Sequence, residues 1–141
     1  MRVKLLADTG ALLALALRND RHHAAAATFV RQHPQARFVL TDLILAEFVT
    51  RLRARAGAAP AAAAGRSFLE SRRYETLFVQ PTLIRGALDR LEQFSDKRLS
   101  LTDCVSFELM DQLGLKTAFA FDSDFRDCGY EMVPDKGEGG R

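Results

Sequence analysis

Apolar residues follow two patterns along the chain, which predict alternating strands and helices. Continuous apolar runs are typical of buried strands, whereas apolar residues three and four positions apart are typical of helices with one face on a core. Strands are expected at residues 3–7, 37–41, 76–80, 115–121 and 130–133, and helices at 10–17, 24–32, 42–55, 60–74, 83–94 and 103–113. This alternation predicts an α/β fold, a three-layer α/β/α sandwich with a mainly parallel central sheet.

Threonine, glycine and proline mark the ends of the expected helices. Thr9, Thr41 and Thr102 each precede a helix, where a threonine hydroxyl can accept a hydrogen bond from a free backbone N–H. The glycine and proline in residues 57–60 separate two helices, and Pro60 suits a first helical turn. Gly114 is expected to end the last helix, because glycine adopts the left-handed conformation without strain.

The length and composition fit one folded unit. A chain of 141 residues with 48% hydrophobic residues can bury a core. We expect a single domain at residues 1–134 and a flexible C-terminal tail at residues 135–141. No apolar run is long enough to cross a bilayer, and the N-terminus lacks a signal-peptide layout, so we expect no membrane association and a cytoplasmic location.

The formal net charge is only +2, but arginines are concentrated after residue 47. The cluster consists of Arg51, Arg53, Arg55, Arg66, Arg72 and Arg73. Two interpretations are open. The arginines contact the phosphates of a nucleic acid, with Arg51 and Arg53 as candidate substrate-binding residues, or they form an ordinary solvated surface.

The cysteines and histidines do not indicate a metal site. Cys104 and Cys128 have neither metal-ligand spacing nor a disulfide-rich context, so we expect ordinary small thiols. His22 and His23 are adjacent and would point to different faces, and with His33 they form no metal motif.

Carboxylates occur where the expected fold would bring side chains to one crevice. Asp8 directly follows the first strand, and open α/β sheets bind ligands at the carboxyl ends of their strands. Asp122 and Asp124 follow the strand at residues 115–121. Asp103 falls in the first turn of a helix, and Glu47 lies on a helix with apolar neighbours.

Each of these acids also has an ordinary structural interpretation. Asp8 can be a solvated loop residue or can help to cap a helix. Asp103 is favoured in a first turn by the helix dipole alone. Glu47 can form an ion pair with Arg51, which lies four residues later on the same helix. No single acid therefore identifies a site.

Taken together, the acids point to a divalent cation. Carboxylates in one crevice repel one another and raise each other's pKa unless a positive charge is present. Mg²⁺ and Mn²⁺ prefer carboxylate and water oxygens and often contact a substrate phosphate. Such an ion can generate hydroxide and stabilise the attacking and leaving oxygens of an in-line displacement. The acids therefore predict hydrolysis of phosphodiester bonds.

The acids stand in four short motifs, which are Leu6-Ala7-Asp8-Thr9, Leu45-Ala46-Glu47, Leu101-Thr102-Asp103 and Phe121-Asp122-Ser123-Asp124-Phe125. The order and spacing of these motifs resemble those of PIN-domain ribonucleases, most of all the VapC-type toxins of bacterial toxin–antitoxin pairs. The resemblance runs from Val3 to Pro134, and only the ordered set is specific.

This resemblance implies a metal-dependent endoribonuclease. It implies that Asp8, Glu47, Asp103 and one or both of Asp122 and Asp124 hold Mg²⁺ or Mn²⁺, with catalysis resting on Asp8, Glu47, Asp103 and Asp122. It also implies that the Thr9 hydroxyl lies near the metal and the RNA substrate. A homodimer and a cognate antitoxin whose tail covers the acidic crevice are implied as partners.

Other functions remain open at this stage. PIN domains also process RNA outside toxin pairs, and a catalytically weak PIN fold can act as a binding module. A phosphohydrolase with an aspartyl nucleophile is disfavoured, because the chain lacks a second aspartate two residues after Asp8. Apolar residues at 12–17, at 43–49 and in the alanine-rich helix exceed the needs of a small core and favour a homodimer interface.

The two acids after the fourth strand are expected to differ. Alternation along the strand places Phe119 and Phe121 on one face and Ala120 on the other. Asp122 then falls on the side of Ala120, where a small neighbour leaves room for a metal. Asp124 falls in a turn and is expected to cap backbone amides, reaching the metal only through water.

Overall fold

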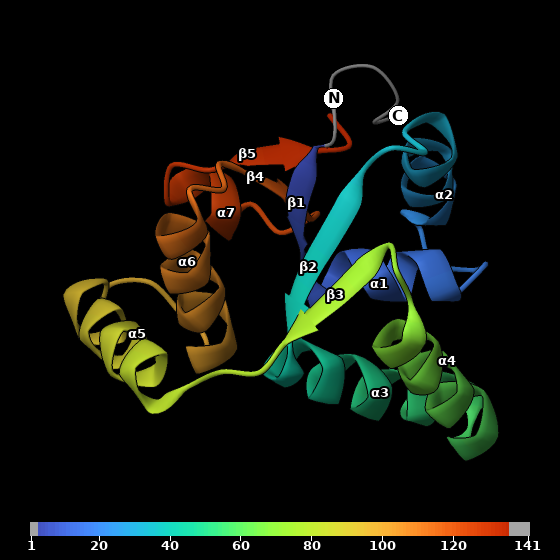
Figure 1. The fold of residues 1–141 in the computed structure, drawn as a ribbon, viewed down its shortest axis with the longest axis horizontal. Coiled ribbons are helices and arrows are strands. Elements are labelled where there is room, and N and C mark those ends of the chain that lie inside the picture. Colours follow the sequence, from blue (N-terminus) through green and yellow to red (C-terminus); the bar gives the residue numbers. More distant parts are fainter. Residues whose placement is uncertain (1–2, 136–141) are drawn as a thin grey trace.

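The computed structural model describes residues 3–135 and contains one five-stranded parallel sheet. The strands are β1 (Lys4–Ala7), β2 (Arg37–Thr41), β3 (Tyr74–Leu77), β4 (Thr117–Phe119) and β5 (Glu131–Val133). They lie in the order β3-β2-β1-β4-β5, so β1 is central (Figure 1). All four neighbouring pairs are parallel, which confirms the expected sheet. The expected tail lies outside the described residues, except for Asp135.

Seven helices within residues 3–135 cover the two faces of the sheet. The helices are α1 (Thr9–Ala16), α2 (His23–Gln32), α3 (Asp42–Ala56), α4 (Ala58–Glu70), α5 (Pro81–Gln93), α6 (Leu101–Leu113) and α7 (Asp124–Asp127). Buried residues of α1 to α4 form one core with the sheet, and those of α5 to α7 form the other (Figure 1). The α/β/α sandwich is therefore confirmed.

Strand side chains alternate between these two cores because successive residues of a strand point to opposite faces. Leu5 and Ala7 of β1 pack with α1 to α4, whereas Leu6 packs with α5 and α6. Phe119 joins the first core and Ala120 the second, as expected, and Phe121 packs against the first core again. The backbone of β1 is thus buried on both sides, which fixes the position of the residue that follows it.

Two of the expected helix boundaries are confirmed by their hydrogen bonds. The Thr41 hydroxyl accepts from the backbone N–H of Ile44 (3.1 Å) and caps α3. Gly114 ends α6 with a φ of 68°, in the left-handed region that favours glycine. The two threonine caps expected at α1 and α6 are wrong and are described with the site.

The segment between α4 and β3 differs from the expectation. Helix α4 ends at Glu70, and Tyr74 begins β3 instead of continuing the helix. The Ser71 hydroxyl accepts hydrogen bonds from the N–H groups of Arg73 and Tyr74, which forms a turn after the helix. Strand β3 therefore pairs with β2 two residues earlier than expected, and Phe78 lies beyond it with 63% of its surface exposed.

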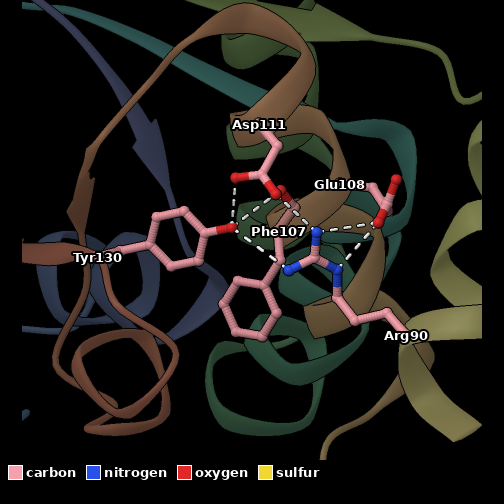
Figure 2. Close-up of polar contacts among 5 residues, drawn as sticks. All are labelled: Arg90, Phe107, Glu108, Asp111 and Tyr130. Carbon is pink, nitrogen blue, oxygen red and sulfur yellow. Dashed lines mark hydrogen bonds and ion pairs between the residues drawn. The ribbon is translucent and has the colours of Figure 1, made fainter. Parts of the chain in front are cut away.

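A polar cluster joins α5, α6 and the segment before β5. The Arg90 guanidinium lies 2.9 Å from a carboxylate oxygen of Glu108 and 2.7 Å from one of Asp111. The Tyr130 hydroxyl donates to Asp111 (2.7 Å), and Arg90 also lies over the Phe107 ring (Figure 2). Burial disfavours the charged form of Arg90, but its hydrogen bonds to both carboxylates outweigh this effect and raise its pKa. The cluster holds α6 against its neighbours.

Among the helices of residues 3–135, none combines the length and the apolar composition needed to span a membrane.

Candidate active site

Asp8 lies at the carboxyl end of the central strand, as expected, and is almost fully buried. Asp8 as a whole is only 8% exposed. Its backbone N–H donates to the carbonyl of Phe119 in β4 (3.0 Å), and its carbonyl accepts from Leu12 in α1 (3.1 Å). The backbone of Asp8 is therefore fixed by both a neighbouring strand and the following helix, so that its carboxylate has a defined place.

The surroundings of Asp8 oppose its negative charge. Burial raises its pKa, and the charges of Asp103, Asp122 and Glu47 raise it further, against a backbone hydrogen bond at Thr9 that lowers it. The resulting pKa is about 7, compared with an ordinary value of 3.8. Asp8 follows β1, and the three other acids come from α3, α6 and the loop after β4. The fold therefore brings acids from four segments toward one point.

Thr9 does not cap α1 as expected. Asp8 is the N-cap residue, although its side chain makes no capping hydrogen bond, and Thr9 is the first residue of the helix. The Thr9 side chain is 2% exposed, and its Oγ1 has no hydrogen-bond partner within residues 3–135. A buried hydroxyl without a hydrogen-bond partner is unfavourable in a protein core. The position of the Thr9 hydroxyl next to the buried Asp8 is therefore consistent with a site for a polar ligand.

Asp103 lies in the first turn of α6, where the sequence placed it, but the cap is Ser100 and not Thr102. The Ser100 hydroxyl accepts from the Asp103 N–H (3.0 Å), and an Asp103 carboxylate oxygen accepts from the Ser100 N–H (3.2 Å). This reciprocal capping box was readable as Ser-x-x-Asp in the sequence. Burial raises the pKa of Asp103, the Ser100 bonds lower it, and Asp122 and Asp124 raise it.

Asp122 and Asp124 lie after the end of β4, which is shorter than expected and ends at Phe119. The expectation that Asp124 caps backbone amides is wrong, because the Asp122 carboxylate accepts from the Asp124 N–H (2.9 Å). At such a turn, the side chain of an aspartate accepts a hydrogen bond from the backbone N–H two residues later. The charge of Asp122 acts on both Asp8 and Asp103. Burial and the charges of Asp122 and Asp127 raise the pKa of Asp124.

Glu47 forms the ion pair with Arg51 that one of the two interpretations predicted. It lies 3.7 Å from the Arg51 guanidinium one helical turn later, with 30% of its side chain exposed. Its charge also contributes to the raised pKa of Asp8, as the smallest of the causes. Because exposed ion pairs are weak, the contact with Arg51 does not commit Glu47 to a structural role.

The comparisons with known proteins decide the family. The family model of the PIN domain matches residues 5–129. The chain belongs to the PIN-domain family. No curated protein matches.

Two solved structures extend the assignment of the PIN domain. VapC20 from Mycobacterium tuberculosis, a toxin that cleaves the sarcin–ricin loop, has a TM-score of 0.84 at 27% identity, covering 89% of this chain and 95% of that chain. VapBC2 from Rickettsia felis, bound to a DNA fragment from its promoter, has a TM-score of 0.68 at 10% identity, covering 92% and 97%. The first confirms the expected likeness to VapC-type PIN domains, and the second shows the same fold.

The acids of this PIN domain fit a cation that is held by few protein ligands. Within residues 3–135, no three His, Cys, Asp or Glu side chains lie close enough to enclose a metal ion. Mg²⁺, however, is commonly held by one or two carboxylates and keeps several waters. The buried Asp8 carboxylate and the unpartnered Thr9 hydroxyl supply oxygen donors of the required kind. The residues present are therefore compatible with Mg²⁺ or Mn²⁺.

The six arginines do not all have the same environment in the PIN domain. Arg73 donates to the backbone carbonyls of Ala36 (3.0 Å), Val30 (2.9 Å) and His33, so its guanidinium fixes the turn before β3. The interpretation of Arg73 as a phosphate contact is therefore wrong. The other five are exposed, namely Arg51, Arg53, Arg55, Arg66 and Arg72.

The two cysteines are the small thiols that were expected, and two of the three imidazoles lie against backbone carbonyls. Cys104 is buried, Cys128 is partly buried, and both are free. The His23 and His33 rings each lie within hydrogen-bond distance of a backbone carbonyl, of Ala14 (2.7 Å) and Phe29 (2.9 Å) respectively. His22 differs from the other two, because its ring stacks on that of Phe121, the residue before Asp122. No pattern in the sequence indicated that contact.

Proposed function

We propose that this PIN domain is a Mg²⁺- or Mn²⁺-dependent endoribonuclease and the toxin of a type II toxin–antitoxin pair. The observation that carries the proposal is the buried Asp8, whose charge is opposed by acids from three other segments and by its own burial. Such a carboxylate is costly unless a cation binds beside it. The likeness to a VapC-type toxin that cleaves RNA supports RNA as the substrate.

Asp8 would hold the ion together with at most one further carboxylate, Asp103 or Asp122, and the remaining acids, Glu47 and Asp124 among them, would act through its waters. When bound, a divalent ion stabilises negative charge on phosphate oxygens and activates water. Without it, the pKa of about 7 lets Asp8 hold a proton near neutral pH. The Ser100 N–H fixes one oxygen of Asp103, so the carboxylate is oriented before any ligand arrives. The Thr9 hydroxyl supplies a further polar group at the base of the site.

Binding of RNA requires positive charge around an acidic centre. Arg51 and Arg53, which lie beyond Glu47 on α3, are proposed to contact phosphates. Arg51 partly neutralises Glu47 at the same time. The Thr9 hydroxyl is proposed to face the substrate as well as the metal.

The proposed reaction is tested by cleavage of single-stranded RNA with purified protein. Cleavage is expected with Mg²⁺ or Mn²⁺ and should stop in chelator. Asp8→Asn should reduce kcat/KM by about 100-fold or more, since loss of an oriented charged group at a reacting centre costs this much. Asp89→Asn, which changes an exposed carboxylate on α5, is the control and should cleave normally. Undiminished cleavage in chelator, or none with either metal, would disprove the proposal.

The toxin assignment needs a second experiment, because a PIN nuclease outside a toxin pair would pass the first. We propose that the protein acts in the cytoplasm as a homodimer that a cognate antitoxin inhibits. Expression should arrest growth, Asp8→Asn should not, and co-expression of the adjacent small gene should restore growth. Growth arrest that the neighbouring product fails to relieve would leave a nuclease without a toxin role.

The proposed homodimer would use other apolar residues than those that the sequence suggested. The apolar residues at 12–17 and 43–49 mostly pack into or against the two cores and leave little surface for a partner. Exposed apolar side chains occur elsewhere, at Leu69, Phe78, Leu88 and Leu113. A mass measurement in solution decides this part of the proposal.

A further inference from the structure

The ring of His22 stacks on the ring of Phe121, the residue before Asp122. The ring centroids are 4.2 Å apart and the planes differ by 5°. Phe121 immediately precedes Asp122, whose charge acts on Asp8 and Asp103. The stack therefore involves the residue next along the chain to an acid of the proposed reaction centre, although His22 comes from the connection between α1 and α2.

His22 is held in place by its backbone. Its N–H donates to the Asp20 carboxylate (2.8 Å), and its carbonyl accepts from Ala26 in α2 (3.0 Å). The Arg21 Nε donates to the His22 ring (3.1 Å). A flat ring fixed in this way needs little further ordering to receive a ligand.

The stack is open to solvent and has positive charge beside it. His22 and Phe121 are only partly buried, and Phe121 rests on the core formed with α1 to α4. Arg18 and Arg21 flank His22 and are both exposed. Phosphates approaching the acids meet repulsion, which arginines at the rim would offset. An aromatic surface with adjacent arginines is the chemistry that binds unpaired nucleotides.

We propose that the His22–Phe121 stack is a binding subsite for one unpaired nucleobase of the RNA, next to the phosphate that is cleaved. The base stacks on the imidazole, and Arg21 contacts a neighbouring phosphate. This inference rests on the proposed ribonuclease function and adds a requirement for single-stranded RNA at the site. A base held in a duplex is already stacked between its neighbours and cannot occupy the subsite.

The test measures KM and kcat for cleavage of a short single-stranded RNA by the metal-loaded protein. His22→Ala should raise KM about tenfold, the size of one base–aromatic stacking interaction, and change kcat less than about twofold. His22→Phe keeps a flat ring and should retain the wild-type KM. His33→Ala is the matched control, because it removes a histidine stacked on Phe29 (4.3 Å between centroids) that forms no part of the proposed site.

RNA substrates that lack one base at a time separate base binding from a purely structural role. Removing the base at one position near the cut should raise KM about tenfold for the wild type and less than about twofold for His22→Ala, because coupled groups are not additive. A loss of kcat alone would show that His22 only positions Asp122, and it would overturn the proposal. Equal KM values for His22→Ala and His33→Ala would do the same. Failure of the wild type to cleave any RNA would instead disprove the ribonuclease.

Discussion

The Asp8 carboxylate is buried at the end of the central strand, and the charges of Asp103, Asp122 and Glu47 act on it there. Burial and neighbouring acids raise its pKa to about 7, so its charged form destabilises the protein in the absence of a cation. The unfolded chain releases the same proton at an ordinary value near 3.8. Between these two values the folded state binds a proton that the unfolded state does not, and the free energy of unfolding therefore falls as the pH rises.

Replacement of Asp8 by asparagine should remove much of this pH dependence. Without divalent ions, Asp8→Asn should be more stable than the wild type at about pH 8, by on the order of 2 kcal/mol, because the amide carries no charge. The advantage should shrink at about pH 5, where the wild-type carboxyl is protonated. Chemical denaturation at both pH values measures the difference.

Asp89→Asn is the matched control for this comparison and should follow the wild type at both pH values, because Asp89 is exposed. Asp103 also has a raised pKa, so some slope should remain in Asp8→Asn. An Asp8→Asn variant that is less stable than the wild type at the higher pH would contradict the account of Asp8.

Asp122 and Asp124 should differ in their effect on cleavage. Asp122→Asn should reduce kcat/KM about 100-fold and Asp124→Asn about tenfold or less, since the charge of Asp122 acts on both Asp8 and Asp103. Asparagine at position 122 can still accept the hydrogen bond from the Asp124 N–H, so the loss would report charge and not a broken turn. Steady-state kinetics with circular dichroism as a folding check decides it, and the reverse ranking would show that the assignment is wrong.

Single residues were predictable where their role depends on near neighbours in the chain. Thr41 caps α3 as expected, because a cap needs only an N–H three residues later. The Ser100 cap has an equally local signature, Ser-x-x-Asp, so the expected cap at Thr102 was wrong for a position that the sequence could have identified. Arg73 was not predictable, because its carbonyl partners lie 37 to 43 residues away and are set by tertiary structure. The same holds for the stack of His22 on Phe121.

At the scale of elements, the sequence predicted six of the seven helices within residues 3–135, missed α7, which was expected to be a turn, and placed the strand ends less well. Helix α5 begins at Pro81, where proline suits a first turn, and α6 ends at Gly114. Strand ends depend on pairing with a neighbour, which an apolar pattern does not contain. Residues 78–79 and 121 continue apolar runs but lie beyond the paired registers of β3 and β4.

The polar cluster around Arg90 should contribute to the stability of the contact between α5 and α6. Arg90→Met should lower the free energy of unfolding by about 2 kcal/mol, because Glu108 would lose its partner while partly buried. Arg85→Met is the control on the same helix. Arg85 is exposed, and its loss should change the free energy by about 0.5 kcal/mol or less. Denaturant unfolding measures both, and equal losses would show that the cluster in Figure 2 contributes nothing specific.

At the scale of the whole molecule, the order of the strands gathers the site. Chain order alone would not place the segment after β4 beside β1, but the sheet order β3-β2-β1-β4-β5 makes them neighbours. Asp8 and the Asp122 segment therefore approach across one ladder, and α6 brings Asp103 to the same edge. The sequence predicted this edge through the general rule that parallel strands present their ligands at their carboxyl ends. How strongly the acids raise the pKa of Asp8 depends on burial, which only the structure shows.

The central claim is that this edge of the sheet is a cation site built around Asp8. Isothermal titration calorimetry of the purified protein with Mn²⁺ tests this claim in the absence of RNA. The account predicts binding to the wild type and to Asp89→Asn, and affinity at least about tenfold weaker for Asp8→Asn. Equal Mn²⁺ affinity of all three proteins, or no binding to the wild type, would contradict it.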